Sequence, residues 1–386
     1  MTGSSARALR SINRREPVAL LERFVRTPSC SGLEGPMADA VVAALTECGV
    51  RDVRQDRHHN VLATLHGRSD GPRRLFLTHL DTGAPGNMVD PYEPRILAAD
   101  RFGKTGEVLR GRGACAPLAS LAALAAAAAA LVRAGLPETG TTYIAAVTRD
   151  LEANHDGIRE LHESFLLDVD LIIACEPSSN RIVLGARGIN QLRLELLGVP
   201  AHRARPAEAA NPLYALADLL SALERLPLPS HPVLGEASLA PFEVRSDASA
   251  PLSPQRVELR IDRRTLPGET TGQIVHALEA VLADILASRP QITGSVVPER
   301  AMYPFETPAE SPLVRGIQRR VRKALSRELE TTYISFASNA SYGIAERGWP
   351  GVALGPGDIR DMGEEEHVGL AEVQEATRIY AVLMAD

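Results

Sequence analysis

The chain has 386 residues, of which 45% are hydrophobic and 23% charged, and its formal net charge is -6. This length and composition are typical of a globular protein with a large core, and they predict two domains. Acidic and basic residues are mixed along the sequence instead of gathering in a basic patch, which excludes nucleic acid as an expected partner and favours a small molecule.

The cysteine pattern and the N-terminus both indicate a cytoplasmic protein. The cysteines at positions 30, 48, 115 and 175 show neither CxxC spacing nor the density of a disulfide scaffold, which suits a reducing compartment. Residues 1–16 are polar and rich in arginine, without the apolar core of a signal peptide. We therefore expect this segment to be frayed.

An uncharged run at residues 114–132 superficially resembles a membrane span. Most of it is alanine, which contributes far less to membrane insertion than leucine, isoleucine, phenylalanine and valine. Pro117 at the first turn and Gly135 after the run predict a buried helix instead, with no membrane partner.

The first half of the chain alternates helices and strands. We predict helices at 18–25, 37–48, 117–133 and 156–166, and strands at 61–65, 75–78, 142–147 and 171–174. Such alternation predicts an α/β fold with a mainly parallel sheet, whose ligands collect at the carboxyl ends of the strands. His79, the segment 150–152 and Glu176 all follow such strand ends.

Residues 188–296 show a different pattern of polar and apolar residues. Strands with alternating polarity at 191–196 and 256–261 and amphipathic helices at 213–226 and 271–286 predict an inserted α+β domain. After it we expect a helix at 313–325, strands and turns around 349–357, and a last helix at 371–383. The predicted first domain is thus 1–187 together with 297–386.

Thr78-His79-Leu80-Asp81 carries the first chemical signal. It follows the apolar run of a buried strand, and an imidazole there can bind a metal through one nitrogen while Asp81 holds the other. Taken alone, the same four residues more often mark a strand end with a solvated His and Asp.

Eight motifs in order resemble the M20 metallopeptidase and aminoacylase family, over nearly the whole chain. They are Pro28-Ser29-Cys30-Ser31-Gly32-Leu33-Glu34-Gly35, Thr78-His79-Leu80-Asp81, Gly111-Arg112-Gly113-Ala114, Thr148-Arg149-Asp150-Leu151-Glu152, Cys175-Glu176-Pro177, the segment from Gly198 through His202 to Asn211, Asp262-Arg263-Arg264-Thr265-Leu266-Pro267-Gly268-Glu269 and Gly355-Pro356-Gly357-Asp358. The resemblance implies a phosphorylase/hydrolase-like catalytic domain with an inserted lid and dimerisation domain. It also implies two zinc ions that share a bridging Asp, and a Glu that activates the attacking water.

This sequence departs from the family pattern at three positions. The bridging Asp falls at Ala116, the catalytic Glu at Leu151 and the last His at Met362. None of these side chains can perform the original role, so the resemblance implies a degenerate dinuclear zinc site.

The motif residues that remain are His79, its orienting Asp81, Glu152 and Glu176. By the resemblance His79 and Glu176 serve one metal and Glu152 the other, so neither ion keeps the three protein ligands of a catalytic zinc. We therefore expect no cofactor. A rebuilt mononuclear zinc site stays open, with His79, Glu152 and Glu176 as ligands and Cys115, Cys175, His155, Asp358 or Asp361 as substitutes.

The substrate side of the family pattern is better preserved. By the resemblance His202 polarises the scissile carbonyl across a homodimer, Asn211 and Arg264 hold the substrate, and Gly355 and Gly357 let the backbone approach it. Each also has a structural alternative: a capped loop, a cross-strand ion pair, or a turn.

Three functions follow. The first is a divergent enzyme that acts on a small amino-acid-derived or amide substrate without zinc, with Glu152, Glu176, His79 and His202 as catalytic groups. Acyl transfer, cyclisation, elimination and isomerisation are all open. The second is a non-catalytic binding or regulatory protein, and the third is hydrolysis through a rebuilt metal site. In each case we expect a homodimer through residues 188–296, and a substrate with a carboxylate or an amide.

Overall fold

The computed structural model describes residues 3–385, which divide into two compact units. The first unit comprises Met1–Gly185, Glu306–Ile334 and Ser338–Asp386, and the second comprises Ala186–Phe305 and Ser335–Ala337. The insert predicted at 188–296 falls within the second unit. That unit extends further because its last strand, β14 (Thr293–Met302), continues past the predicted boundary.

The first unit is built on a nine-stranded sheet with the order β1-β2-β6-β3-β7-β17-β8-β15, and β16 also pairs with β8. The bounds of these strands are β1 Asp52–Gln55, β2 Val61–His66, β3 Ser69–His79, β6 Thr139–Val147, β7 Leu171–Ala174, β8 Ile182–Ala186, β15 Phe305–Glu306, β16 Thr331–Ile334 and β17 Gly351–Ala353. The central strands β6, β3, β7 and β17 run parallel, whereas β1, β2 and β8 pair antiparallel. The predicted α/β class is confirmed, with a sheet that is mixed at its margins.

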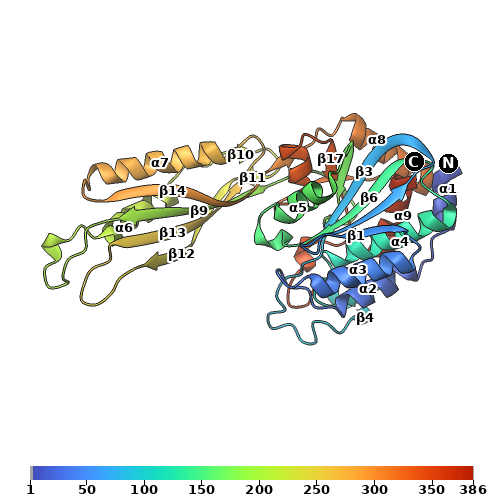
Figure 1. Ribbon diagram of the computed structural model, residues 1–386, viewed down its shortest axis with the longest axis horizontal. Coiled ribbons are helices and arrows are strands. Elements are labelled where there is room, and N and C mark those ends of the chain that lie inside the picture. Colours follow the sequence, from blue (N-terminus) through green and yellow to red (C-terminus); the bar gives the residue numbers. More distant parts are fainter. Residues whose placement is uncertain (1–2, 386) are drawn as a thin grey trace. The chain divides into compact units, whose positions relative to one another are not determined.

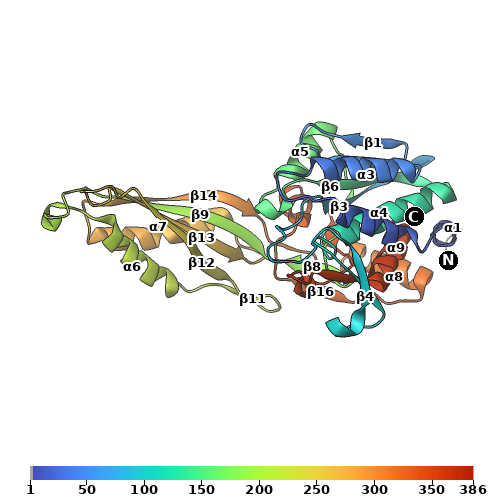
Figure 2. The ribbon, with the colours of Figure 1, turned by 90° about the horizontal axis from the view of Figure 1, so that it is seen from below.

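Helices cover both faces of this sheet. Their bounds are α1 Gly3–Arg10, α2 Glu16–Val25, α3 Gly35–Glu47, α4 Leu118–Ala134, α5 Asp156–Phe165, α8 Pro312–Leu325 and α9 Leu370–Ala385. On one face α2, α3 and α4 lie side by side (Figures 1 and 2), and they share a core with α9 and with Phe76 of β3. On the other face α5 packs Ile158 and Leu161 against Leu75 and Leu77 of the same strand. The alternation along β3 places successive side chains in two different cores.

The frayed N-terminus predicted for residues 1–16 is wrong from residue 3 onward. Helix α1 forms there, with Ala8 fully buried and Arg7 paired with Glu138. Met1 and Thr2 lie outside the described residues. Packing against α4 and α9 supplies the stability that this short polar helix lacks by itself.

Helix α4 is the alanine-rich run, and its alanines are buried among neighbouring helices. It begins after Pro117 and ends at Gly135, whose φ of 65° gives the left-handed termination expected of glycine. Within residues 3–385 no helix combines the length and hydropathy needed to cross a bilayer.

The second unit is a four-stranded antiparallel sheet with the order β12-β13-β9-β14. Its elements are β9 Gly188–Leu197, α6 Pro212–Glu224, β10 Ser230–His231, β11 Gly235–Glu236, β12 Ser238–Ser246, β13 Arg256–Thr265 and α7 Thr271–Ala287. Helices α6 and α7 cover one face of this sheet (Figure 2) and enclose a leucine-rich core with it.

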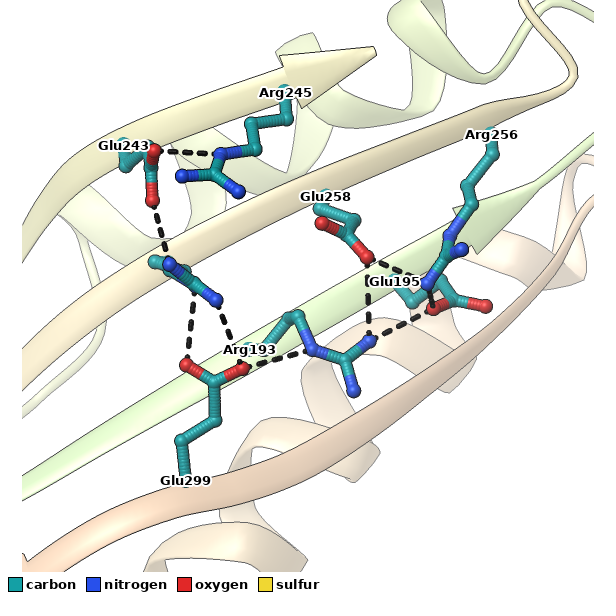
Figure 3. Close-up of polar contacts among 8 residues, drawn as sticks. Arg193, Glu195, Glu243, Arg245, Arg256, Glu258 and Glu299 are labelled. Carbon is teal, nitrogen blue, oxygen red and sulfur yellow. Dashed lines mark hydrogen bonds and ion pairs between the residues drawn. The ribbon is translucent and has the colours of Figure 1, made fainter. Parts of the chain in front are cut away.

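The face of this sheet that points away from α6 and α7 carries a ladder of ion pairs. Figure 3 shows Glu299 beside Arg193, and Glu258 and Glu195 around Arg256. Charges of alternating sign on adjacent strands satisfy one another across the sheet. This ladder explains the alternating polarity of the two strands predicted from the sequence.

The remaining short elements connect these layers in the first unit. A three-stranded sheet contains β4 Arg95–Ala98, β5 Glu107–Arg110 and β18 His367–Gly369. A tight turn at Asp150–Glu152 follows β6, and another at Ile359–Asp361 precedes β18. The first of these turns shapes the candidate site.

Candidate functional site

The site is organised around His79, the last residue of β3. Its imidazole is buried, and Nδ1 donates to Asp81 Oδ1 at 3.0 Å. Asp81 is fully buried and is fixed further by Ser31 Oγ, which donates to Oδ2 at 2.7 Å. This arrangement fixes the orientation of the ring and leaves Nε2 as its outward-facing nitrogen.

Asp150 faces that outer nitrogen. Its Oδ2 lies 3.8 Å from His79 Nε2, and Asn339 donates its side-chain amide to Oδ1. The turn Asp150–Glu152 begins after Arg149 and ends before Ala153, which have φ values of 58° and 59°. These two left-handed residues fold the segment into a tight turn that directs Asp150 inward.

Glu152, a predicted catalytic residue, is the last residue of this turn. Glu152 is only half-buried, and its charge contributes to the raised pKa of Arg149. Leu151, at the family's catalytic position, points outward and is 46% exposed. The acid beside His79 is therefore Asp150, one residue before the two positions that the resemblance singles out.

Glu176 completes the group from the neighbouring strand. It lies two residues after the end of β7, is buried, and accepts a hydrogen bond from Ser338 Oγ at 2.7 Å. The structure thus brings together His79, Asp81 and Glu176 as the sequence predicts, and adds Asp150.

Burial and mutual charge perturb all four groups. Burial lowers the pKa of His79, but the carboxylates of Asp150, Asp81 and Glu176 outweigh it and raise that pKa to about 10. Burial, together with the charges of Glu176 and Asp81, raises the pKa of Asp150 to about 7 against the effect of His79. Burial likewise raises the pKa of Glu176, whereas the hydrogen bonds from His79 and Ser31 hold the pKa of Asp81 below its ordinary value. At neutral pH the imidazole is therefore a buried cation among carboxyl groups.

A buried polar chain continues from Asp150 away from His79. Asn339 Oδ1 accepts a hydrogen bond from His155 Nδ1–H at 3.0 Å, and His155 Nε2 lies 3.0 Å from Ser341 Oγ. Ser338 and Asn339 lie in a loop and Ser341 at the start of the helical turn that follows it. This segment carries no motif, so sequence reasoning missed these residues. The only available signal was a short polar run, Ser338-Asn339-Ala340-Ser341, among apolar neighbours.

The turn that carries the lost bridging position is held by Glu366. Its carboxylate is buried and accepts from the backbone N–H groups of Gly113, Cys115 and Ala116, at 2.9, 3.1 and 3.4 Å. Arg112 pairs with the same carboxylate at 3.0 Å. Ala116 is 8% exposed and presents only a methyl group where the family pattern has a carboxylate.

The proposed substitute ligands are all engaged in other contacts in this structure. Burial raises the pKa of both the Cys115 and the Cys175 thiol, which disfavours the thiolate that zinc needs. His155 uses both ring nitrogens within the buried polar chain, and Asp361 pairs with Lys104. Arg360 lowers the pKa of Asp358 to about 2 by binding its carboxylate. Among residues 3–385 no group of three or more His, Cys, Asp and Glu side chains is arranged to hold a metal ion.

Gly355 and Gly357 lie in the loop after β17, and both have structural reasons to be glycine. A Cβ at Gly355 would come within 2.6 Å of the Glu176 carbonyl oxygen. Gly357 has a φ of 83°, and a Cβ there would meet Cys115 Sγ at 2.7 Å. Close packing against Glu176 explains Gly355, and the positive φ and close packing against Cys115 explain Gly357. Contact of these glycines with a substrate stays a prediction.

The three predicted lid residues belong to the second unit. Asn211 caps α6 by accepting from the Leu213 N–H, and Arg264 pairs with Asp262 of its own strand at 2.7 Å. His202 is exposed, and its Nδ1 accepts from the Ala204 N–H at 3.2 Å. These contacts match the structural alternatives, with the Arg264 pair lying along one strand and not across two. Roles in substrate binding stay predictions.

Comparison with known proteins places the chain in a family. Residues 75–386 match the sequence pattern described as "Peptidase family M20/M25/M40". The protein YgeY of Escherichia coli K12, described as uncharacterized, is 24% identical over 357 residues, or 87% of this chain and 85% of that protein. Succinyl-diaminopimelate desuccinylase from Erythrobacter litoralis is 30% identical over 230 residues, which are 54% of this chain and 57% of that enzyme.

Solved structures agree on the fold. Aminopeptidase PepT from Bacillus cereus superimposes with a TM-score of 0.76 at 18% identity, covering 97% of this chain and 99% of that one. An M20 family metallo-carboxypeptidase from Sulfolobus solfataricus gives a TM-score of 0.75 at 15% identity over 96% and 98% of the two chains. Because the family pattern spans well over half of the sequence, the chain belongs to the M20/M25/M40 peptidase family.

Proposed function

We propose that the chain is an enzyme that binds a small amino-acid-derived or amide substrate beside His79, Asp150 and Glu176. In this proposal these side chains transfer protons to and from the substrate, in place of water activated by a zinc pair. Acyl transfer, cyclisation and elimination all need such a transfer, because a nitrogen or carbon next to a carbonyl group must gain or lose a proton.

The observation that carries the proposal is the position of Asp150. Its carboxyl group lies 3.8 Å from His79 Nε2, the nitrogen that would otherwise face a metal. An acid directly opposite an imidazole forms a pair of proton donor and acceptor that can transfer protons without a metal ion. Apolar residues at 116, 151 and 362 support the same view, because they remove the bridging ligand, the water-activating Glu and the last His.

Each member of the group has a role that its contacts support. His79 is oriented by Asp81, so its Nε2–H can donate to a substrate carbonyl oxygen and stabilise negative charge there. Glu176 is held by Ser338 and can accept from a substrate amine or amide N–H. Asp150 is held by Asn339 and is the acid or base beside both. His155 acts through Asn339 and is a positioning residue.

The second candidate function is metal-dependent amide hydrolysis. The relatives favour it, since the similar proteins include a desuccinylase and several peptidases. It requires ligands outside the family pattern, because Ala116 and Met362 have no donor oxygen or nitrogen in their side chains.

One experiment separates these functions and a non-catalytic role. The purified full-length chain is incubated with N-succinyl amino acids, other N-acyl amino acids and dipeptides, with and without 1,10-phenanthroline, and products are followed by mass spectrometry. We expect turnover that the chelator leaves unchanged, and that Asp150→Asn and Glu176→Gln each reduce at least about 100-fold. Glu163→Gln, an exposed acid on α5, is the matched control and should retain full turnover.

Three results would count against the proposal. Loss of turnover with the chelator would favour the rebuilt metal site. Turnover that survives both substitutions would place the chemistry elsewhere. Substrate binding without any conversion across the panel would favour the non-catalytic protein.

A further inference from the structure

The charges of the candidate site do not balance, because one imidazole faces three carboxyl groups. Asp81 binds the His79 ring directly, at 3.0 Å, and compensates its positive charge. Asp150 and Glu176 are instead held by uncharged donors, an amide and a hydroxyl group. Within residues 3–385 no lysine or arginine forms an ion pair with any of the three acids. Since both side chains are at most 10% exposed, the site lacks a cation for two poorly solvated acids.

The imidazole of His79 also has a ring nitrogen that lacks a hydrogen bond. His79 is only 6% exposed, and of its two ring nitrogens only Nδ1 forms a hydrogen bond within the described part of the chain. Asp150 Oδ2 lies 3.8 Å from Nε2, which is longer than a hydrogen bond. A poorly solvated N–H group without an acceptor is unfavourable, so this nitrogen indicates a place for a ligand oxygen. An unsatisfied donor and two uncompensated acids thus occur in one site.

Two exposed leucines lie on loops that meet at this site. The Ser31 hydroxyl and the Leu151 N–H both donate to Asp81 Oδ2, at 2.7 and 3.0 Å, so the two loops are held together by the carboxylate that orients the imidazole. Leu33, two residues after one of these donors, is 70% exposed, and Leu151 is 46% exposed. A single exposed leucine is ordinary, but two on adjoining loops form an apolar border to a charged site.

We infer that the site binds an α-aminoacyl compound with an apolar side chain, whose protonated amine supplies the missing cation to Asp150 and Glu176. The carbonyl oxygen would accept from His79 Nε2, because the amine and the carbonyl group of such a compound are attached to the same carbon atom and reach adjacent partners together. The apolar side chain would cover the border formed by Leu33 and Leu151. An N-acyl group in place of the amine would remove the cation, so N-acyl compounds should bind more weakly.

The inference rests on the proposed function for the location of the site and adds the class of substrate. L-Leucinamide is a suitable probe, since at pH 7 it carries a protonated amine beside a carbonyl group and an apolar side chain. Titration calorimetry on the full-length chain, dialysed against EDTA, should give saturable binding of leucinamide. N-Acetyl-L-leucinamide lacks the cation and glycinamide lacks the side chain, so each should bind at least about tenfold more weakly. Mass spectrometry of the same samples measures any conversion.

Two variants test the two halves of the inference. Glu176→Gln removes the charge and keeps the oxygen that accepts from Ser338, so it should weaken leucinamide binding at least about tenfold. Leu151→Ala changes an exposed side chain and should fold; it should weaken leucinamide binding about fourfold, roughly the effect of losing one buried methylene group, and leave glycinamide binding unchanged. Leu166→Ala is the matched control, because Leu166 is 82% exposed at the C-terminal end of α5, away from the turn that carries Asp150.

The control should bind leucinamide as the unmodified chain does, and equal weakening in Leu166→Ala and Leu151→Ala would overturn the inference. Equal binding of leucinamide and its N-acetyl form would overturn it as well, as would binding that appears only after zinc is restored. Failure of the proposed function gives a different result. Turnover of N-acyl amino acids by a chain that does not bind leucinamide would refute the substrate class alone, whereas leucinamide binding without conversion of any compound would support the class and count against catalysis.

Discussion

Asn60→Asp tests how the turn that carries Asp150 is held in place. Asn60 is fully buried, and its Oδ1 accepts from the Thr148 N–H at 2.8 Å and from the Thr148 hydroxyl at 3.1 Å. Its side-chain amide donates to Asp56 Oδ2 at 2.9 Å. Aspartate keeps the shape and the acceptor, but it replaces the donor with a second carboxylate oxygen against Asp56.

The size of the effect follows from this 2.9 Å contact. Two carboxylates at that distance repel by about 6 kcal/mol at an effective dielectric constant of about 20. The new acid can instead stay protonated in the folded state, which costs about 4 kcal/mol at pH 7 for a group with an unfolded pKa of about 3.9. The smaller figure sets the limit, so we expect a loss of about 3–4 kcal/mol in the free energy of unfolding.

The pH dependence gives this prediction its signature. A carboxyl whose folded pKa is raised above the unfolded value binds protons more tightly when folded, so stability falls as pH rises between the two values. The deficit of Asn60→Asp should therefore shrink by about 1.4 kcal/mol for each pH unit of acidification below pH 7.

The assay is urea unfolding followed by fluorescence of Trp349, the only tryptophan, which lies in the same unit. Asn87→Asp is the control, because Asn87 is exposed and donates to Glu364 at 3.1 Å in the same kind of pair. Solvent screening should keep its cost below about 1 kcal/mol. Equal costs for the two variants, or a deficit at position 60 that does not change with pH, would refute the reasoning.

Three further predictions concern other parts of the chain. Burial lowers the pKa of His155, so on acidification the unfolded state binds a proton before the folded state does, and the free energy of unfolding should fall below about pH 6.5. In urea titrations the free energy of unfolding of His155→Gln should depend less on pH, by up to about 1.4 kcal/mol per pH unit. Equal pH slopes for the two proteins would contradict this. Gly355→Ala should cost about 1–3 kcal/mol by forcing its Cβ against Glu176, whereas Gly363→Ala meets nothing within 4 Å and should be neutral. Strand β12 lies at an edge of its sheet and carries Phe242, which is 54% exposed, so it is a suitable surface for the predicted homodimer. Phe242→Asp should therefore lower the mass measured by light scattering toward that of one chain. A mass of one chain before substitution would exclude the dimer.

The sequence was most informative where periodicity and length act together. The helices at 271–286 and 313–325 were predicted to within one residue of α7 and α8, because apolar spacing and capping residues mark both ends. Helix α1 was missed because its polar segment depends on packing against distant helices. No local pattern contains that information.

The residues of the candidate site also differ in how far the sequence predicts them. His79, Asp81 and Glu176 were predictable because each follows a strand in a recognisable motif. Asp150 was not chosen over Glu152, because the choice depends on the left-handed residues Arg149 and Ala153, which few non-glycine positions adopt. Ser338 and Asn339 were missed because they approach the site from a loop more than 150 residues away in sequence.

The most direct test of the account is the metal content of the full-length chain, expressed with added zinc and measured by elemental analysis after dialysis. The account predicts zinc well below one ion per chain, at the same level in the unmodified protein and in His79→Ala. A stoichiometric zinc pair in the unmodified protein that is lost in His79→Ala would contradict it.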